Sequence, residues 1–195
     1  GALPLIDQPG TAFHYGHSTD LLGFLIARIA DAPLGDVLKR RIFDPLGMKD
    51  TGFTVPVAQQ HRRAAPYGFD QAGRLCVRRS GPGNSFLAER PESMAYVSGG
   101  QGLWSTLDDY LTFARMFVNA GAVDDCRLLQ PETVARMVTN CLSEQQRVGA
   151  GSLLKPGHGF GLGVAVVLDP KEAGPMPCGG GVGAVGWPGA FGGWW

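Results

Sequence analysis

The sequence has little charge and no excess of either sign. Lys and Arg together number 17, Asp and Glu also number 17, and the formal net charge is zero. A protein that binds a nucleic-acid backbone needs a surplus of Lys and Arg to replace the phosphate counterions. We therefore expect no nucleic-acid partner. Because 44% of the residues are apolar and only 17% are charged, the composition also excludes an intrinsically disordered chain.

The chain also lacks a long apolar run and a clustered set of cysteines. No run approaches the roughly 20 residues that a membrane-spanning helix needs, and residues 160–168 are interrupted by glycine. The four cysteines, Cys76, Cys126, Cys141 and Cys178, form no Cys-x-x-Cys pair and have no histidine at metal-ligand spacing. We interpret them as reduced thiols of a cytoplasmic protein, with no membrane, metal or cofactor involved.

The two ends lack the features of a complete fold. Gly1 follows no signal peptide and caps no element, whereas Trp194 and Trp195 end the chain with side chains that normally bury about 150–250 Å² each. We therefore interpret the chain as part of a larger fold. The remainder would belong to a missing segment or to a second chain.

The sequence pattern predicts helices first. Apolar residues spaced three and four apart predict helices over residues 21–30, 34–43, 108–120 and 131–137. In the first helix, one apolar stripe is formed by Leu21, Leu22, Leu25, Ile26 and Ile29. Ser18 or Thr19 is expected to cap this helix, and Ser105 or Thr106 the third. Residues 44–48, with a proline and a glycine, should end the second.

Strands are expected later in the chain. Residues 160–168 predict one buried strand, a glycine-rich loop follows, and residues 186–195 predict the next strand. Residues 53–97 should be loops with short strand-like runs at 67–69 and 74–77. Helices followed by antiparallel strands, without β-α-β alternation, favour an α+β fold. We expect one domain, with residues 1–156 mainly helix and loop and residues 157–195 forming the sheet.

Six segments, in order, resemble motifs of one known family. They are residues 9–18 (PGTAFHYGHS), 45–51 (PLGMKDT), 99–110 (GGQGLWSTLDDY), 128–134 (LLQPETV), 158–163 (HGFGLG) and 186–192 (GWPGAFG). Together they are similar to the serine β-lactamase-like hydrolases, which include class C β-lactamases, penicillin-binding proteins and related esterases. The resemblance implies a β-lactamase/transpeptidase-like fold, incomplete at both ends, with a helical region beside an antiparallel sheet.

The resemblance also implies a set of site residues. Tyr15 matches the family's proton-transfer tyrosine, whereas Trp187, Pro188 and Gly189 match the strand that lines the substrate site. The Ala190 amide would be an oxyanion-hole donor. The nucleophilic serine of the family's Ser-x-x-Lys motif lies well upstream of the tyrosine, so we expect it before Gly1 and not in this chain. The chain alone should then be inactive.

Two departures from the lactamase pattern predict the substrate. His17 replaces an asparagine, and we expect it to contact the substrate. Trp187 replaces a lysine that would attract a substrate carboxylate, which favours neutral ester substrates over carboxylate-bearing lactams. These features predict an esterase-like serine hydrolase that acts on a small molecule through an acyl-enzyme.

The alternative is a non-catalytic fragment or binding module. In that reading Tyr15 is a core aromatic and Gly189 belongs to a packed strand end. Within the enzyme reading, a further possibility is that His17 is the catalytic base, because histidine is the usual partner of a nucleophilic serine.

Overall fold

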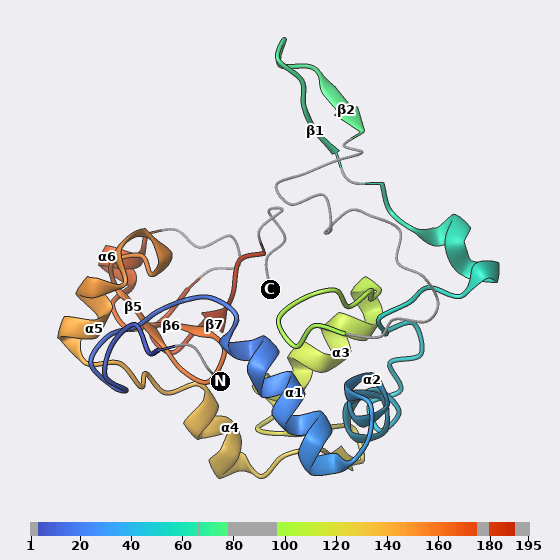
Figure 1. The fold of residues 1–195 in the computed structure, drawn as a ribbon, viewed down its shortest axis with the longest axis horizontal. Coiled ribbons are helices and arrows are strands. Elements are labelled where there is room, and N and C mark those ends of the chain that lie inside the picture. The colour runs from blue at the N-terminus through green and yellow to red at the C-terminus, as the bar shows by residue number, and fades with distance from the viewer. Residues whose placement is uncertain (1–3, 66, 78–96, 175–179, 190–195) are drawn as a thin grey trace. The chain divides into compact units, whose positions relative to one another are not determined.

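The computed structural model describes residues 4–65, 67–77, 97–174 and 180–189 (Figure 1). The chain divides into two compact units. Unit 1 comprises residues 1–16 and 112–195, and unit 2 comprises residues 17–111. Each has its own buried residues. None of the helices in the described ranges is long and apolar enough to cross a membrane.

Unit 2 contains the first helices and a small hairpin. Helix α1 (Ser18–Ala30) is followed by α2 (Leu34–Leu38), which continues as a π-helical turn, η1 (Lys39–Phe43). A 3-10 helix, η2 (Val57–Arg62), precedes the antiparallel strands β1 (Tyr67–Phe69) and β2 (Leu75–Val77). The buried apolar residues of this unit are Leu34, Val37, Phe43, Leu46, Met48 and Phe53.

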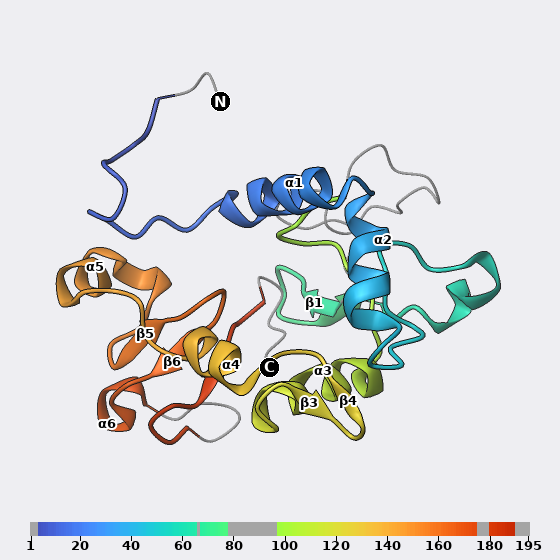
Figure 2. The same cartoon turned by 90° about the horizontal axis from the view of Figure 1, so that it is seen from below.

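Helix α1 differs from its prediction in two respects. It begins at Ser18 with His17 as its N-cap and no capping side chain, so the predicted cap by Ser18 or Thr19 is wrong. Most of its predicted apolar stripe is exposed, and the helix packs through Gly23 instead. A Cβ on Gly23 would lie 3.0 Å from the Gly99 Cα. The close approach of two glycine backbones therefore decides which side of α1 faces inward. Figures 1 and 2 both place α1 beside α2.

The sequence pattern located the next helices well. Helix α3 (Leu107–Val118) crosses from unit 2 into unit 1, and Thr106 Oγ1 accepts the Asp109 amide at 3.3 Å, as expected of a cap. Helix α4 (Pro131–Met137) has the predicted bounds, with proline in its first turn. Between these helices lies a hairpin of β3 (Ala122–Val123) and β4 (Cys126–Arg127).

The remaining elements of unit 1 surround a three-stranded sheet. Helix α5 (Glu144–Gly149) and the 3-10 turn η4 (Gly151–Leu153) precede it. The sheet has the order β5 (His158–Phe160), β6 (Ala165–Val167), β7 (Val185–Gly186), and both pairings are antiparallel. Helix α6 (Pro170–Ala173) follows β6 and precedes β7 along the chain. Figure 2 shows β5 and β6 side by side. Helices plus small antiparallel sheets confirm the α+β prediction.

The predicted single strand over residues 160–168 is wrong. The chain reverses after Phe160, because Gly163 adopts a φ of 87° and the Gly161 amide bonds to the Val164 carbonyl. The prediction of burial was right, since Val164, Ala165, Val166 and Val167 are all buried.

The last predicted strand is also shorter than expected. Strand β7 ends at Gly186, one residue after Val185, and residues 187–189 continue without strand pairing. Pro188 has no amide hydrogen to donate to a neighbouring strand, which explains why pairing does not extend through it. Residues 190–195 lie outside the described part of the chain.

Candidate functional site

The structure brings together two of the predicted site residues in unit 1. The Trp187 indole Nε1–H donates a hydrogen bond of 3.2 Å to the Tyr15 hydroxyl oxygen, and the ring centroids lie 5.2 Å apart. Tyr15 is 53% exposed, so a molecule in solution can reach this residue. The contact leaves the phenolic hydrogen available for transfer, because the oxygen acts as the acceptor.

An aromatic row holds this pair in place. Phe160, at the end of β5, meets Trp187 edge-to-face at 5.2 Å, and Phe13 lies 5.0 Å from Phe160 between ring centroids. Phe160 is fixed through its amide, which donates to Asn140 Oδ1 at 3.1 Å. The row packs on three buried residues, Ala150, Leu154 and Ala165. Trp187 is therefore held by the core of unit 1 through its contact with Phe160. Tilted and edge-to-face contacts of this kind are the favoured geometries of aromatic pairs.

The segment that carries Tyr15 is attached to α5. Gly10 adopts a φ of 85°, and its carbonyl accepts a hydrogen bond of 2.6 Å from Gln146 Nε2. Gln146 also forms the capping box of α5 with Ser143. A glutamine in the first turn of α5 thus fixes a segment 136 positions away, five residues before Tyr15.

The structure describes the predicted strand residues up to Gly189. Trp187 is half-buried, and Pro188 and Gly189 are exposed directly after β7. Ala190, whose amide was expected to act as an oxyanion donor, lies outside the described residues.

His17 belongs to unit 2 and is highly exposed there. Its Nδ1 lies 3.4 Å from Asp20 Oδ2, and the hydroxyl of Ser98 donates to the other carboxylate oxygen of Asp20. A catalytic triad needs the histidine between the serine and the acid. Here the acid lies between the other two, so this group lacks the order in which His17 would activate Ser98.

One serine has the Ser-x-x-Lys spacing, which the sequence interpretation overlooked. Ser152 is followed by Lys155, but Ser152 lies in the three-residue turn η4 and Leu154 is extended, with φ −120° and ψ 109°. The motif requires a helix that places the lysine one turn from the serine. Because the chain extends between Ser152 and Lys155, the local backbone does not provide that arrangement.

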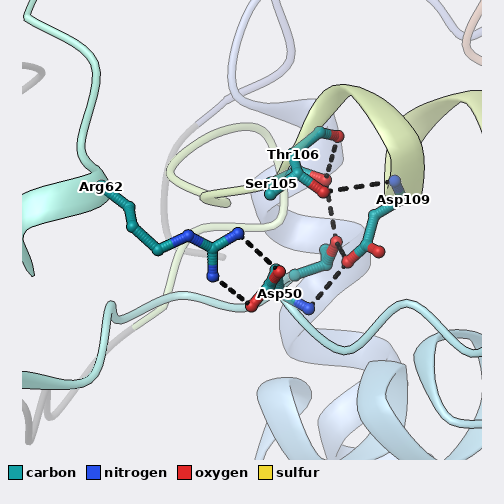
Figure 3. Close-up of polar contacts among 6 residues, drawn as sticks. Asp50, Arg62, Ser105, Thr106 and Asp109 are labelled. Atoms are coloured by element: carbon teal, nitrogen blue, oxygen red, sulfur yellow. Dashed lines mark hydrogen bonds and ion pairs between the residues drawn. The ribbon is translucent and has the colours of Figure 1, made fainter. Parts of the chain in front are cut away.

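A second polar cluster joins two of the recognised motifs within unit 2 (Figure 3). Asp109 Oδ2 accepts the amide of Asp50 and the hydroxyl of Thr51, both at 2.8 Å. Arg62 binds both carboxylate oxygens of Asp50, at 2.9 and 2.8 Å, and this hydrogen bonding lowers the pKa of Asp50. Thr51 Oγ1 also meets Ser105 Oγ at 2.8 Å.

An adjoining backbone pairing strengthens this connection. Gly52 and Trp104 exchange two backbone hydrogen bonds, and the Arg63 guanidinium lies 4.5 Å from the centroid of the Trp104 ring. The cluster therefore fastens residues 50–63 to the start of α3. Its partners are satisfied by one another, which is typical of a structural contact.

Comparison with known proteins identifies the family. The sequence model of the Beta-lactamase family matches residues 1–195. The chain belongs to the beta-lactamase family. This finding accounts for the order of the six motifs and confirms the resemblance drawn from them.

Relatives within the beta-lactamase family include enzymes. The chain is 43% identical over 195 residues to Protein Rv1367c of Mycobacterium tuberculosis, covering 99% of this chain and 47% of that protein. It is 30% identical over 204 residues to Esterase EstB of Burkholderia gladioli, covering 98% and 48%. Among solved structures, EstCE1, described as a hydrolase with promiscuous acyltransferase activity, superposes with a TM-score of 0.76 at 27% identity, covering 99% and 50%.

These comparisons define the extent of the match. The chain spans about half the length of the curated relatives it matches. The chain has the β-lactamase/transpeptidase-like fold, and its relatives include an esterase and a hydrolase with acyltransferase activity.

Proposed function

We propose that the complete protein is a serine hydrolase that cleaves neutral carboxylic esters or amides through an acyl-enzyme. The observation that supports this most directly is the contact between Tyr15 and Trp187, which are 172 positions apart. Both were singled out from the sequence for this chemistry. Half-exposed Tyr15 offers a proton-transfer group at a surface that a substrate can reach.

In the proposed reaction, the serine of a Ser-x-x-Lys motif outside this chain attacks the substrate carbonyl carbon. Tyr15 Oη takes the serine hydroxyl proton, either as a phenolate or by passing its own proton to the lysine of that motif. The proton then returns to the departing alcohol or amine as the tetrahedral intermediate collapses. Water attacks the acyl-serine in the same manner and releases the acid.

Trp187 would support this role in two ways. Its N–H faces the oxygen on which negative charge develops, and hydrogen bonds to charged oxygens are about twice as strong as neutral ones. Its indole also replaces a cation, so nothing at this position attracts a substrate carboxylate. Pro188 and Gly189, exposed beside it, would line the path of the substrate, and the Ala190 amide would bind the oxyanion.

The test is Tyr15→Phe in the full-length protein with a short-chain p-nitrophenyl ester. We expect kcat to fall roughly 10²–10⁴-fold, the usual worth of a positioned acid–base group. The melting temperature should stay within a few degrees, because the ring and its packing remain. Tyr67→Phe is the matched control, since Tyr67 is 62% exposed on β1 and has no proposed part in the reaction.

Three outcomes would each contradict a part of the proposal. A near-wild-type kcat in Tyr15→Phe removes Tyr15 from the mechanism. Absence of turnover and of serine labelling in the full-length protein favours the non-catalytic alternative. A fluorophosphonate should label a serine outside residues 1–195, and labelling of Ser152 would refute the assignment of the nucleophile.

A further inference from the structure

Helix α1 carries an aliphatic row on one side. At 100° per residue, Leu21, Leu25 and Ile29 lie in one row, and Leu22 lies beside Ile29. We call these four residues the leucine face. Gly23 and Ala27 lie on the opposite side of the helix, where they face the rest of unit 2.

The contacts of α1 within unit 2 are made by the opposite side. A Cβ on Gly23 would come 2.9 Å from Leu34 Cδ2, and a Cβ on Gly99 would come 2.2 Å from the Thr19 carbonyl oxygen. Asp20, next to this side, accepts the Ser98 hydroxyl. The helix is therefore already packed inward, and its packing does not use the leucine face.

The leucine face is highly exposed in the structure. The exposed fractions are 69% for Leu21, 53% for Leu22, 54% for Leu25 and 76% for Ile29. A single exposed leucine needs no explanation, but a surface helix normally places polar residues opposite its packed side. A contiguous aliphatic row in that position is typical of an interaction surface.

We infer that the leucine face packs against the complementary part of the beta-lactamase-family protein, the half that lies outside the region matched here. The relatives supply the main argument, because this chain matches only 47%, 48% and 50% of their lengths. A protein core divided between two halves exposes an aliphatic face of this kind in each half. The inference depends on the family alone and holds whether or not the protein hydrolyses esters.

A second copy of the chain fits the leucine face less well. A stable dimer buries roughly 800 Å² on each partner, contributed by about 20–30 residues. Four side chains of one helix supply only a small part of that area. A complementary half of the same protein adds contacts elsewhere and does not require the leucine face to hold the complex alone.

The experiment compares one substitution in two contexts. In the first, the 195 residues are studied alone. In the second, they replace the matched stretch of Rv1367c, so that the remainder of that relative supplies the complementary part. Leu25→Asp is introduced in both. Leu107→Asp is the matched control, because Leu107 is an 84% exposed leucine at the start of α3.

We expect Leu25→Asp to shift the melting temperature of the isolated chain by no more than about 2 °C, since the side chain is half-exposed there. In the chimera the same carboxylate would be buried in an apolar contact, and the melting temperature should fall by more than about 5 °C. Leu107→Asp should have equal, small effects in both contexts.

Equal effects of Leu25→Asp in both contexts would overturn the inference. So would a dimer of the isolated chain, seen by sedimentation, that Leu25→Asp dissociates while the chimera is unaffected. If the chimera does not unfold cooperatively, the remainder of Rv1367c is co-expressed as a separate tagged polypeptide. Retention of the wild-type chain but not of Leu25→Asp supports the inference, and no retention overturns it. Catalysis is not measured, so failure here is separate from failure of the proposed reaction.

Discussion

Thr51 Oγ1 donates a hydrogen bond of 2.8 Å to Asp109 Oδ2 across 58 positions of the sequence. The same oxygen accepts the Asp50 amide, while the amide of Asp109 is bound by Thr106 Oγ1 (Figure 3). One carboxylate thus connects the turn after η1 to the first turn of α3. The contact joins residues of two of the six motif segments, 45–51 and 99–110, and lies within unit 2.

The first prediction concerns this carboxylate. Asp109→Ala removes the acceptor of two part-buried hydrogen bonds and should lower the free energy of unfolding by about 1–3 kcal/mol. Asp109→Asn keeps an oxygen that can accept both hydrogen bonds, so it should lower the free energy of unfolding by less than Asp109→Ala does. Urea unfolding followed by circular dichroism measures both. If the two variants are equally stable, the negative charge of Asp109, and not its capacity to accept hydrogen bonds, stabilises the fold.

The second prediction concerns pH. Hydrogen bonding from Arg62 lowers the pKa of Asp50, with its charge adding to the effect and burial opposing it. A carboxyl whose pKa is lower in the folded state stabilises the fold above its unfolded pKa of about 3.9, and this stabilisation disappears as the pH falls through the folded pKa.

Wild-type protein should therefore exceed Arg62→Gln in stability at about pH 7, and the difference should shrink towards about pH 3. Denaturant midpoints at the two pH values measure it. The pair is partly exposed, so high salt should also reduce the difference. A gap between the variants that is constant with pH would mean that Asp50 does not carry the effect.

The third prediction tests the Tyr15–Trp187 hydrogen bond in the chain itself. Tyr15→Phe removes the acceptor and keeps the ring, so the indole N–H proton of Trp187 should move upfield in a ¹H–¹⁵N spectrum. Trp187→Phe identifies the resonance by its disappearance. The indole of Trp104, which lies beside Arg63 in unit 2, is the internal control and should not move. An unchanged Trp187 resonance would show that the bond is not formed in solution.

The fourth prediction concerns specificity. Because Trp187 provides no positive charge, the full-length protein should hydrolyse short-chain p-nitrophenyl esters with a higher kcat/KM than penicillins or cephalosporins. Trp187→Lys should reduce the difference in kcat/KM between esters and lactams by restoring a cation at this position. A preference of the wild-type protein for lactams by about tenfold or more, worth about 1.4 kcal/mol, would contradict the prediction.

The sequence located the elements whose signals are local. Helix α4 was predicted with its observed bounds, because Pro131 suits a first turn and the apolar spacing ends near Met137. The stop after η1 was also correct, since Gly47 adopts a φ of 68° and Met48 bonds back to Phe43. Such features depend only on residues within about one helical turn of each other, so a short segment of sequence is enough to predict them.

Prediction failed where several conformations satisfy the same local pattern. Residues 160–168 are aliphatic enough for one strand, but the glycines at 161 and 163 also permit a reversal, and pairing of β5 with β6 selects it. Similarly, α1 has more than one apolar side. A close approach of Gly23 and Gly99, 76 positions apart in the sequence, selects the side that packs. Neither choice is visible in a single segment.

The sequence by itself determined the family, the order of the motifs and the candidates Tyr15 and Trp187, because residue identity and spacing carry this information directly. Only the tertiary structure decided that the Trp187 N–H reaches the Tyr15 oxygen, and that the leucine face of α1 remains exposed. The physical reason is distance along the chain. A contact between residues 172 positions apart depends on the path of every element between them, which no local propensity specifies.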